Sequence, residues 1–160
     1  MVTSFAERWA NKERELGFEG IASQMVQFGS DILPSDAAPC LTFNAAATPL
    51  PIHEVFGSPT DWSSAERERF SQSMVIGSDG AGNPFCVEKA TESVWLFDHD
   101  DRFRTQQFVN CSVGQLAECL LAYMGEDGPD NFQSAVTGID PKAIIPGTFW
   151  WQETKGLAQG

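Results

Sequence analysis

Residues 74–123 read MVIGSDGAGNPFCVEKATESVWLFDHDDRFRTQQFVNCSVGQLAECLLAY. Short runs of β-branched and aromatic residues recur in this stretch about every ten residues, and Gly, Asp, Asn or Pro bounds each run. This spacing is typical of an antiparallel meander, in which each strand turns back beside the one before it. The stretch therefore predicts four strands, at residues 74–76, 85–87, 94–97 and 107–109.

A capped helix is predicted directly after the last of these strands. Ser112 is a typical N-cap residue, and Gln115 stands three residues later, as in a capping box. The apolar residues that follow repeat at helical spacing on one face, namely Val113, Leu116, Leu120 and Met124. We expect an amphipathic helix that ends before Gly125 and turns this face to a core.

Shorter elements are predicted towards the N-terminus. A capping box at Ser4 predicts a first helix through Leu16, and its sparse apolar residues predict a loosely packed segment over residues 1–20. Leu41–Phe43 and Ile52–Phe56 are β-prone runs between prolines, so we expect strands there. Further helix starts are predicted at Ser63 or Ser64, at Asp130, at Asp140 followed by Pro141, and at Thr148.

The fold class that these elements predict is α+β, with a central, mostly antiparallel sheet flanked by helices. A chain of 160 residues is long enough to bury a sizeable core without disulfides or metals. We therefore expect one domain over residues 1–160.

The charge of the chain restricts its partners. Its 22 acidic residues outnumber its 10 basic residues, which gives a formal net charge of −12. Such a field repels nucleic-acid backbones and anionic membrane surfaces, and it attracts a basic protein. The four cysteines show no CxxC spacing, and there is no signal-peptide pattern or apolar run of about 18 residues. We therefore expect a cytoplasmic protein with reduced thiols and a protein partner, without nucleic acid or membrane.

Two polar turns resemble ligand sites but lack the residues that such sites need. The glycine-rich turn at residues 77–84 has Pro84 and no Lys where a phosphate loop needs one. Read as an EF-hand loop from Asp98, the chain has Phe103 where Gly is needed and Val109 where Glu is needed. Both segments are thus predicted to be turns. His99 is flanked by acids, but no Ser or Cys nucleophile lies in a recognisable motif, so we expect no catalytic residue, no metal and no cofactor.

The order of these segments resembles that of the SUKH superfamily, small α+β proteins that include the fungal Smi/Knr regulators and bacterial immunity proteins. The resemblance rests on Ile76–Gly80 with Gly82–Pro84, on Asp98–Asp100, on Phe108–Asn110, and on Ser112 with the helix after it. It implies a non-catalytic, bacterial immunity protein that binds a cognate toxin domain, such as a nuclease or a deaminase.

An acidic surface suits a basic toxin that itself binds nucleic acid, because carboxylates can occupy its phosphate-binding groove. The predicted partner-binding residues are Asp61, Trp62, Glu66, Glu68, Asp98, Asp100 and Asp101, with Trp62 or Trp95 as exposed aromatic anchors. Trp95 lies within a predicted strand, which favours a core position.

Two other functions stay open at the level of sequence. One is a regulatory scaffold that resembles the fungal members, although the long disordered flanks of those proteins have no counterpart in this chain. The other is a small metal-dependent hydrolase built on Asp79 or on Asp98–Asp101, with His99 in its pocket.

Overall fold

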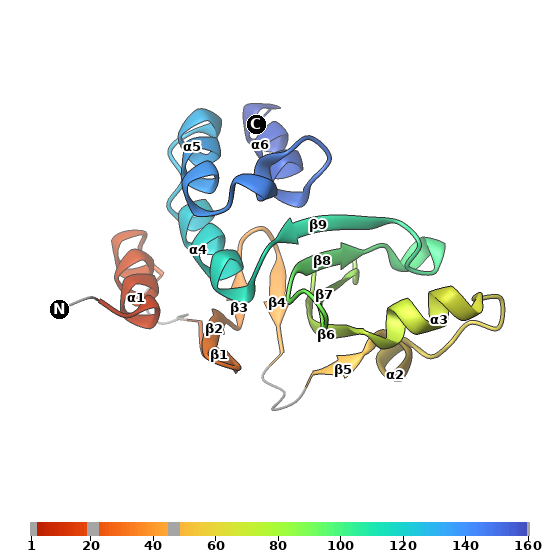
Figure 1. Ribbon diagram of the computed structural model, residues 1–160. Helices are drawn as coiled ribbons and strands as arrows, with labels where there is room; N and C mark the ends of the chain where they lie inside the picture. Colours follow the sequence, from red (N-terminus) through yellow and green to blue (C-terminus); the bar gives the residue numbers. More distant parts are fainter. Residues whose placement is uncertain (1–2, 19–22, 45–48, 160) are drawn as a thin grey trace.

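The computed structural model describes residues 3–18, 23–44 and 49–159, and Figure 1 shows how its elements are arranged. In chain order these elements are α1 (Phe5–Glu15), β1 (Met25–Phe28), β2 (Asp31–Pro34), β3 (Asp36–Ala37), β4 (Leu41–Phe43), β5 (Leu50–Pro51), α2 (Ile52–Phe56), α3 (Ser64–Ser71), β6 (Ser73–Ser78), β7 (Pro84–Glu88), β8 (Val94–Phe97), η1 (His99–Asp101), β9 (Gln106–Asn110), α4 (Val113–Met124), α5 (Pro129–Ile139), η2 (Pro141–Ile144) and α6 (Phe149–Gln159).

The main sheet has seven strands in the described part of the chain. Its order is β3-β4-β6-β7-β8-β9, and β5 pairs with β6 beside β4. All of its pairings are antiparallel. The predicted meander is confirmed as β6 to β9, and the strand predicted at residues 41–43 is β4. The predicted α+β class, with a mostly antiparallel sheet flanked by helices, is also confirmed.

Two apolar cores lie on the two faces of this sheet. Neighbouring residues of β6 alternate between them, so Ile76 packs in the core with α1, α4, α5 and α6, and Val75 packs in the core with α2 and α3. Figure 1 shows these two groups of helices on opposite sides of the strands. The second core is largely aromatic, and its rings come from Trp62, Phe70, Phe97 and Phe103.

Capping residues begin α1, α3 and α4 as the sequence predicts. In α3 and α1 the capping boxes form in full, at Ser63 with Glu66 and at Ser4 with Glu7. In α4 the Oγ atom of Ser112 accepts a hydrogen bond from the backbone N–H of Gln115, at 3.2 Å. These caps satisfy backbone N–H groups that have no partner inside the first turn.

The packing of α1 rests on two aromatic rings, since the partly buried Phe5 packs against the larger core beside Trp9. Trp9 is only 2% exposed and lies in the larger core, while Leu16 is exposed. Arg8 adds an ion pair to Glu118 of α4. Loose packing over residues 1–20 stays a prediction, because residues 1–2 and 19–20 of that segment lie outside the described residues.

The strand predicted at Ile52–Phe56 is wrong, because these residues form the helix α2. The apolar residues Ile52, Val55 and Phe56 also fit the i, i+3, i+4 spacing of a helix, and a run this short fits either period. The extended chain ends one residue earlier, where Leu50 and Pro51 pair with β6 as β5. Pro51 then occupies the N-cap position in extended geometry.

Other differences from prediction lie in short elements. Gly128 rather than Asp130 is the N-cap of α5, with Pro129 as its first residue. Asp140 and Pro141 start η2 as expected. The hairpin of β1 and β2 was not predicted, and it forms a separate two-stranded sheet against α4.

Candidate partner-binding surface

The predicted acidic residues of the α3 region are held by two arginines. Arg102 Nη1 lies 2.6 Å from Asp61 Oδ2, and Arg104 Nε lies 2.6 Å from Glu66 Oε2. Arg104 Nη2 also approaches Asp61 Oδ2, at 3.7 Å. These contacts join the start of α3 to the segment between η1 and β9, and two carboxylates here face two guanidinium groups. This part of the surface is therefore nearly neutral, while Glu68 on α3 is exposed.

Glu66 is the residue whose acidity these contacts change most. The hydrogen bond from the Arg104 side chain, and then the one from the backbone N–H of Ser63, lower the pKa of Glu66 to about 2. The ionised carboxylate is the form that both donors stabilise. The pair with Arg104 is thus complete above the ordinary value of 4.5 and is lost as the pH falls through about 2.

We expect the Glu66 carboxyl group to be still ionised at pH 3 in the unaltered protein, about one pH unit above its lowered pKa. The measurement is an acid titration in which NMR follows the chemical shift of the Glu66 carboxyl carbon. Arg104→Gln should move the pKa of Glu66 upward towards its ordinary value. The matched control is Arg67→Gln, since Arg67 lies on α3 beside Glu66 but its guanidinium contacts the Thr60 carbonyl oxygen instead of the Glu66 carboxylate. Titration of Glu66 near its ordinary value in the unaltered protein would contradict the pairing.

The acidic turn at residues 98–101 is built by hydrogen bonds within the chain. Asp98 Oδ1 accepts from the backbone N–H of Asp100, and Asp101 accepts from the backbone N–H of Thr105. The hydrogen bond from the Thr105 hydroxyl is the main cause that lowers the pKa of Asp101. Asp100 stays exposed, with the His99 Nε2 atom 3.3 Å from its carboxylate.

His99 connects the two polar turns that the sequence singled out. Its backbone N–H and its Nδ1 atom both contact the side-chain oxygen of Asn83, at 3.0 and 2.6 Å. Asn83 in turn donates to Asp79, whose carboxylate also accepts from the backbone N–H of Ala81. Within residues 3–18, 23–44 and 49–159 no group of three His, Cys, Asp or Glu side chains is arranged to hold a metal ion.

Trp62 does not offer the exposed ring that the sequence suggested. It is 3% exposed, its Nε1 atom donates to the Arg102 carbonyl oxygen at 3.1 Å, and its ring packs 4.6 Å from that of Phe70. Trp62 therefore supports the surface from beneath. Trp95 is partly buried, with its ring 5.3 Å from that of Phe108 and the Arg69 guanidinium over it.

Exposed apolar side chains occur beside the paired charges, on α2. Val55 is 47% exposed and Phe56 is 44% exposed. The Phe56 ring lies 5.0 Å from that of Phe103, which directly follows Arg102 in the chain. We call Val55, Phe56, Asp61, Glu66, Glu68, Arg102 and Arg104 the α2–α3 surface. It combines exposed apolar residues with charged ones, which is the composition of many protein interfaces.

Sequence reasoning missed α2 and the two arginines. The helix α2 has only five residues, too few for its apolar spacing to distinguish a helix from a strand. The ion pairs join residues about forty positions apart, so no local pattern shows them. The alternation of Arg102 and Arg104 beside an acidic turn was the available signal, since opposite charges attract and this chain has 22 acidic residues.

Two of the thiols are unsuited to nucleophilic chemistry. Burial raises the pKa of Cys119 to about 12 and raises that of Cys86 as well. A thiol attacks as its thiolate, so these two cysteines act as small apolar residues of the cores.

The chain matches the SUKH-4 immunity protein family over residues 32–156, which is most of its length and includes the α2–α3 surface. This finding confirms the resemblance to the SUKH superfamily. No curated protein and no solved structure matches the chain. Among the described helices, none is both long enough and apolar enough to cross a membrane.

Proposed function

We propose that this chain, which belongs to the SUKH-4 immunity protein family, binds a cognate toxin domain and blocks it without catalysis. The family match over residues 32–156 is the observation that carries the proposal. In this proposal the chain works as one domain over residues 1–160 in the cytoplasm of a bacterium, and its partner is a protein rather than nucleic acid or a membrane.

The charge of the chain supports a basic partner. A net charge of −12 accelerates the encounter with a positively charged protein and disfavours binding to nucleic acid. Toxins that cut or modify nucleic acid carry basic surfaces, since they must bind phosphates. We therefore propose a toxin of this class, whose basic groove is covered when the immunity protein binds.

The α2–α3 surface is the face that we propose for this contact. Interface energy is usually concentrated in a few apolar or aromatic residues surrounded by polar ones. Phe56 offers such a ring, held from behind by Phe103. Arg102 and Arg104 fix the carboxylates of Asp61 and Glu66 before the partner arrives, which reduces the entropy lost on binding. Exposed Glu68 and Asp100, together with the half-buried Asp98 and Asp101, extend the negative charge around this centre in our proposal.

We expect Phe56→Ala to weaken binding to the toxin by about thirtyfold, or about 2 kcal/mol, because it removes the central ring. The measurement is calorimetric titration with the toxin domain encoded by the adjacent gene. Ile145→Ala is the matched control, since Ile145 is also an exposed apolar residue, 54% accessible, but follows η2 in the chain. It should change the dissociation constant less than about twofold.

Two results would contradict different parts of the proposal. Tight binding that Phe56→Ala leaves unchanged would place the interface elsewhere on the molecule. Absence of binding in the unaltered protein would contradict the function itself. Melting curves of both variants establish that each is folded, since Phe56 also packs on Phe103.

A further inference from the structure

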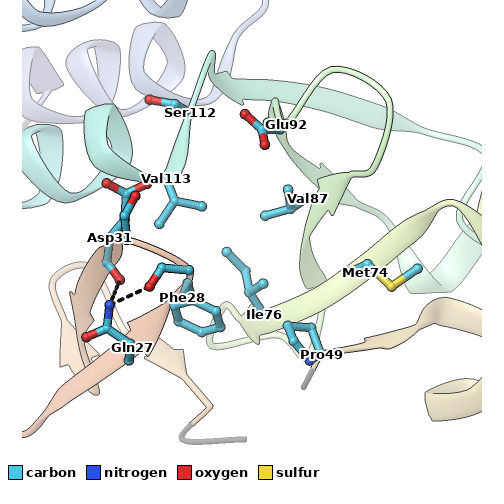
Figure 2. Close-up of a pocket in the computed structure, with 12 residues that line it drawn as sticks. Gln27, Phe28, Asp31, Pro49, Met74, Ile76, Val87, Glu92, Ser112 and Val113 are labelled. Carbon is cyan, nitrogen blue, oxygen red and sulfur yellow. Dashed lines mark hydrogen bonds between the residues drawn. The ribbon is translucent and has the colours of Figure 1, made fainter. Parts of the chain in front are cut away.

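A pocket of about 320 Å³ opens between the β1–β2 hairpin, the main sheet and the first turn of α4. Figure 2 shows apolar side chains from these three elements around it, namely Phe28, Met74, Ile76, Val87 and Val113. Its volume is at the lower end of the range of about 300–1,000 Å³ that small-molecule sites occupy. The pocket is therefore large enough for one long side chain, and its apolar walls favour an aliphatic one.

The charged groups that line this pocket are acidic. Asp31 on the hairpin and Glu92 in the β7–β8 turn lie on different sides of it in Figure 2. Among the described residues, no lysine or arginine lines the pocket, and none forms an ion pair with Asp31 or Glu92. This contrasts with Asp61 and Glu66 of the α2–α3 surface, which pair with arginines of the chain itself. An occupant that matches both walls and charge must be cationic with an apolar stem.

An anionic occupant is disfavoured, although the N-terminus of a helix lies beside the pocket. Asp31 already faces the first turn of α4, because a Cβ atom added to Gly114 would lie 3.0 Å from Asp31 Oδ1. The Ser112 hydroxyl caps the same turn by accepting from the backbone N–H of Gln115. The chain thus supplies its own negative group to the positive end of the helix dipole.

Glu92 is the acidic residue that is free to meet a ligand. It is exposed, and its backbone has φ +63° in a turn closed by a hydrogen bond from its N–H to the Glu88 carbonyl oxygen. Glycine or asparagine adopts this conformation more readily than glutamate does. The turn therefore carries a carboxylate where its backbone geometry alone would favour a smaller residue.

We propose that this pocket receives a lysine or arginine side chain that projects from the toxin, with its stem on Phe28 and Val113 and its cationic head at Glu92 and Asp31. The inference rests on the proposed function, since the toxin is the partner that brings the side chain. The pocket lies on the face of the main sheet that carries α4, and β5 is the segment that connects its rim to the α2–α3 surface on the other face. Pro49 lines the pocket, the exposed Leu50 follows it in β5, and α2 begins directly after Pro51.

The first test needs no toxin. Nα-acetyl-arginine methylamide and its citrulline analogue have the same shape, but only the arginine derivative is charged. We expect NMR titration with the arginine derivative to give saturable shifts in Ile76, Val87 and Val113, and Glu92→Gln to weaken that binding several-fold. The citrulline analogue should bind at least fivefold more weakly. No saturable shift in these residues, or equal binding of the two compounds, would overturn the proposal.

The second test uses the toxin. Glu92→Gln should weaken toxin binding about tenfold, the size of one well-placed charge contact. Val87→Phe, which narrows the pocket, should weaken binding at least as much. Asp127→Asn removes the same charge from the exposed turn between α4 and α5, and should change the affinity less than about twofold. Equal effects of Glu92→Gln and Asp127→Asn on toxin binding would contradict the proposal that the pocket receives a cationic side chain, and would leave the proposed function intact.

The two tests separate this inference from the proposed function. Binding of the arginine derivative in the pocket, combined with no toxin binding by the unaltered protein, would contradict the proposed function and leave the cation pocket standing. Toxin binding that Glu92→Gln and Val87→Phe leave unchanged would contradict only the pocket.

Discussion

Replacement of Asp140 by alanine is expected to lower the free energy of unfolding by about 3–5 kcal/mol, because it leaves buried donors without a partner. Asp140 is 1% exposed. Its carboxyl group accepts hydrogen bonds from the Asn110 side chain at 3.1 Å and from the backbone N–H of Cys111 at 2.8 Å. Asn110 in turn accepts from the Trp150 indole at 2.9 Å. The network joins β9, η2 and α6 inside the larger core.

Urea unfolding followed by Trp fluorescence measures this loss. Asp127→Ala is the matched control, since it removes the same group from an exposed turn and should change stability by less than about 0.5 kcal/mol. Asp140→Asn, which keeps one acceptor oxygen, should lie between the two. A loss below about 1 kcal/mol for Asp140→Ala would contradict the view that this network holds the C-terminal helices to the sheet.

Replacement of Gly77 by alanine is expected to cost about 3 kcal/mol or more, because the added methyl group collides with a neighbouring strand. A Cβ atom at Gly77 would lie 2.3 Å from the Thr42 carbonyl oxygen and 2.7 Å from Phe43 Cδ1. Gly77 pairs directly with Phe43, so β4 must move away from β6 to make room. The close approach of β4 and β6 thus depends on the absence of a side chain here.

The same substitution at Gly156 is the control. Gly156 lies in α6, and nothing lies within 4 Å of an added Cβ atom there. Alanine favours a helix over glycine, so Gly156→Ala should raise stability by up to about 1 kcal/mol. Thermal or urea unfolding measures the free energy of unfolding of both variants. Equal stability of Gly77→Ala and the unaltered protein would show that the two strands are not as close as described.

The central part of the fold was predictable because its signals are local. Turn residues at regular intervals predicted β6 to β9, and Ser112 with its apolar face predicted α4. The segments around it carry weaker signals. Five residues at Ile52–Phe56 fit a strand or a helix equally well, and only the pairing of Leu50 and Pro51 with β6 settles where the extended chain ends.

The candidate surface was less predictable because it depends on contacts between distant residues. Asp61 and Glu66 were expected as free acids, but Arg102 and Arg104 reach them from about forty residues away. Trp62 was expected at the surface, yet Phe70 and Phe103 enclose its ring. Composition indicates that a tryptophan and many acids are present, and tertiary packing decides which of them remain available to a partner.

The proposed interface agrees with how the chain distributes charge. Asp61 and Glu66 of the α2–α3 surface are paired with arginines of the chain, whereas Glu92 and Asp31 at the pocket have no cationic partner among the described residues. A basic toxin would therefore find fixed polar contacts around Phe56 and unpaired acidic groups at the pocket. Salt would weaken the contacts of a basic toxin with Glu92 and Asp31 more than its apolar contact with Phe56.

Calorimetric titration of the unaltered protein with the toxin domain of the adjacent gene, at low and at physiological salt, tests the central claim most directly. We predict saturable binding with one immunity protein for each toxin domain, together with a dissociation constant that rises with salt because the partner is basic. The absence of binding at both salt concentrations would contradict the assignment of this chain as the immunity protein of that toxin.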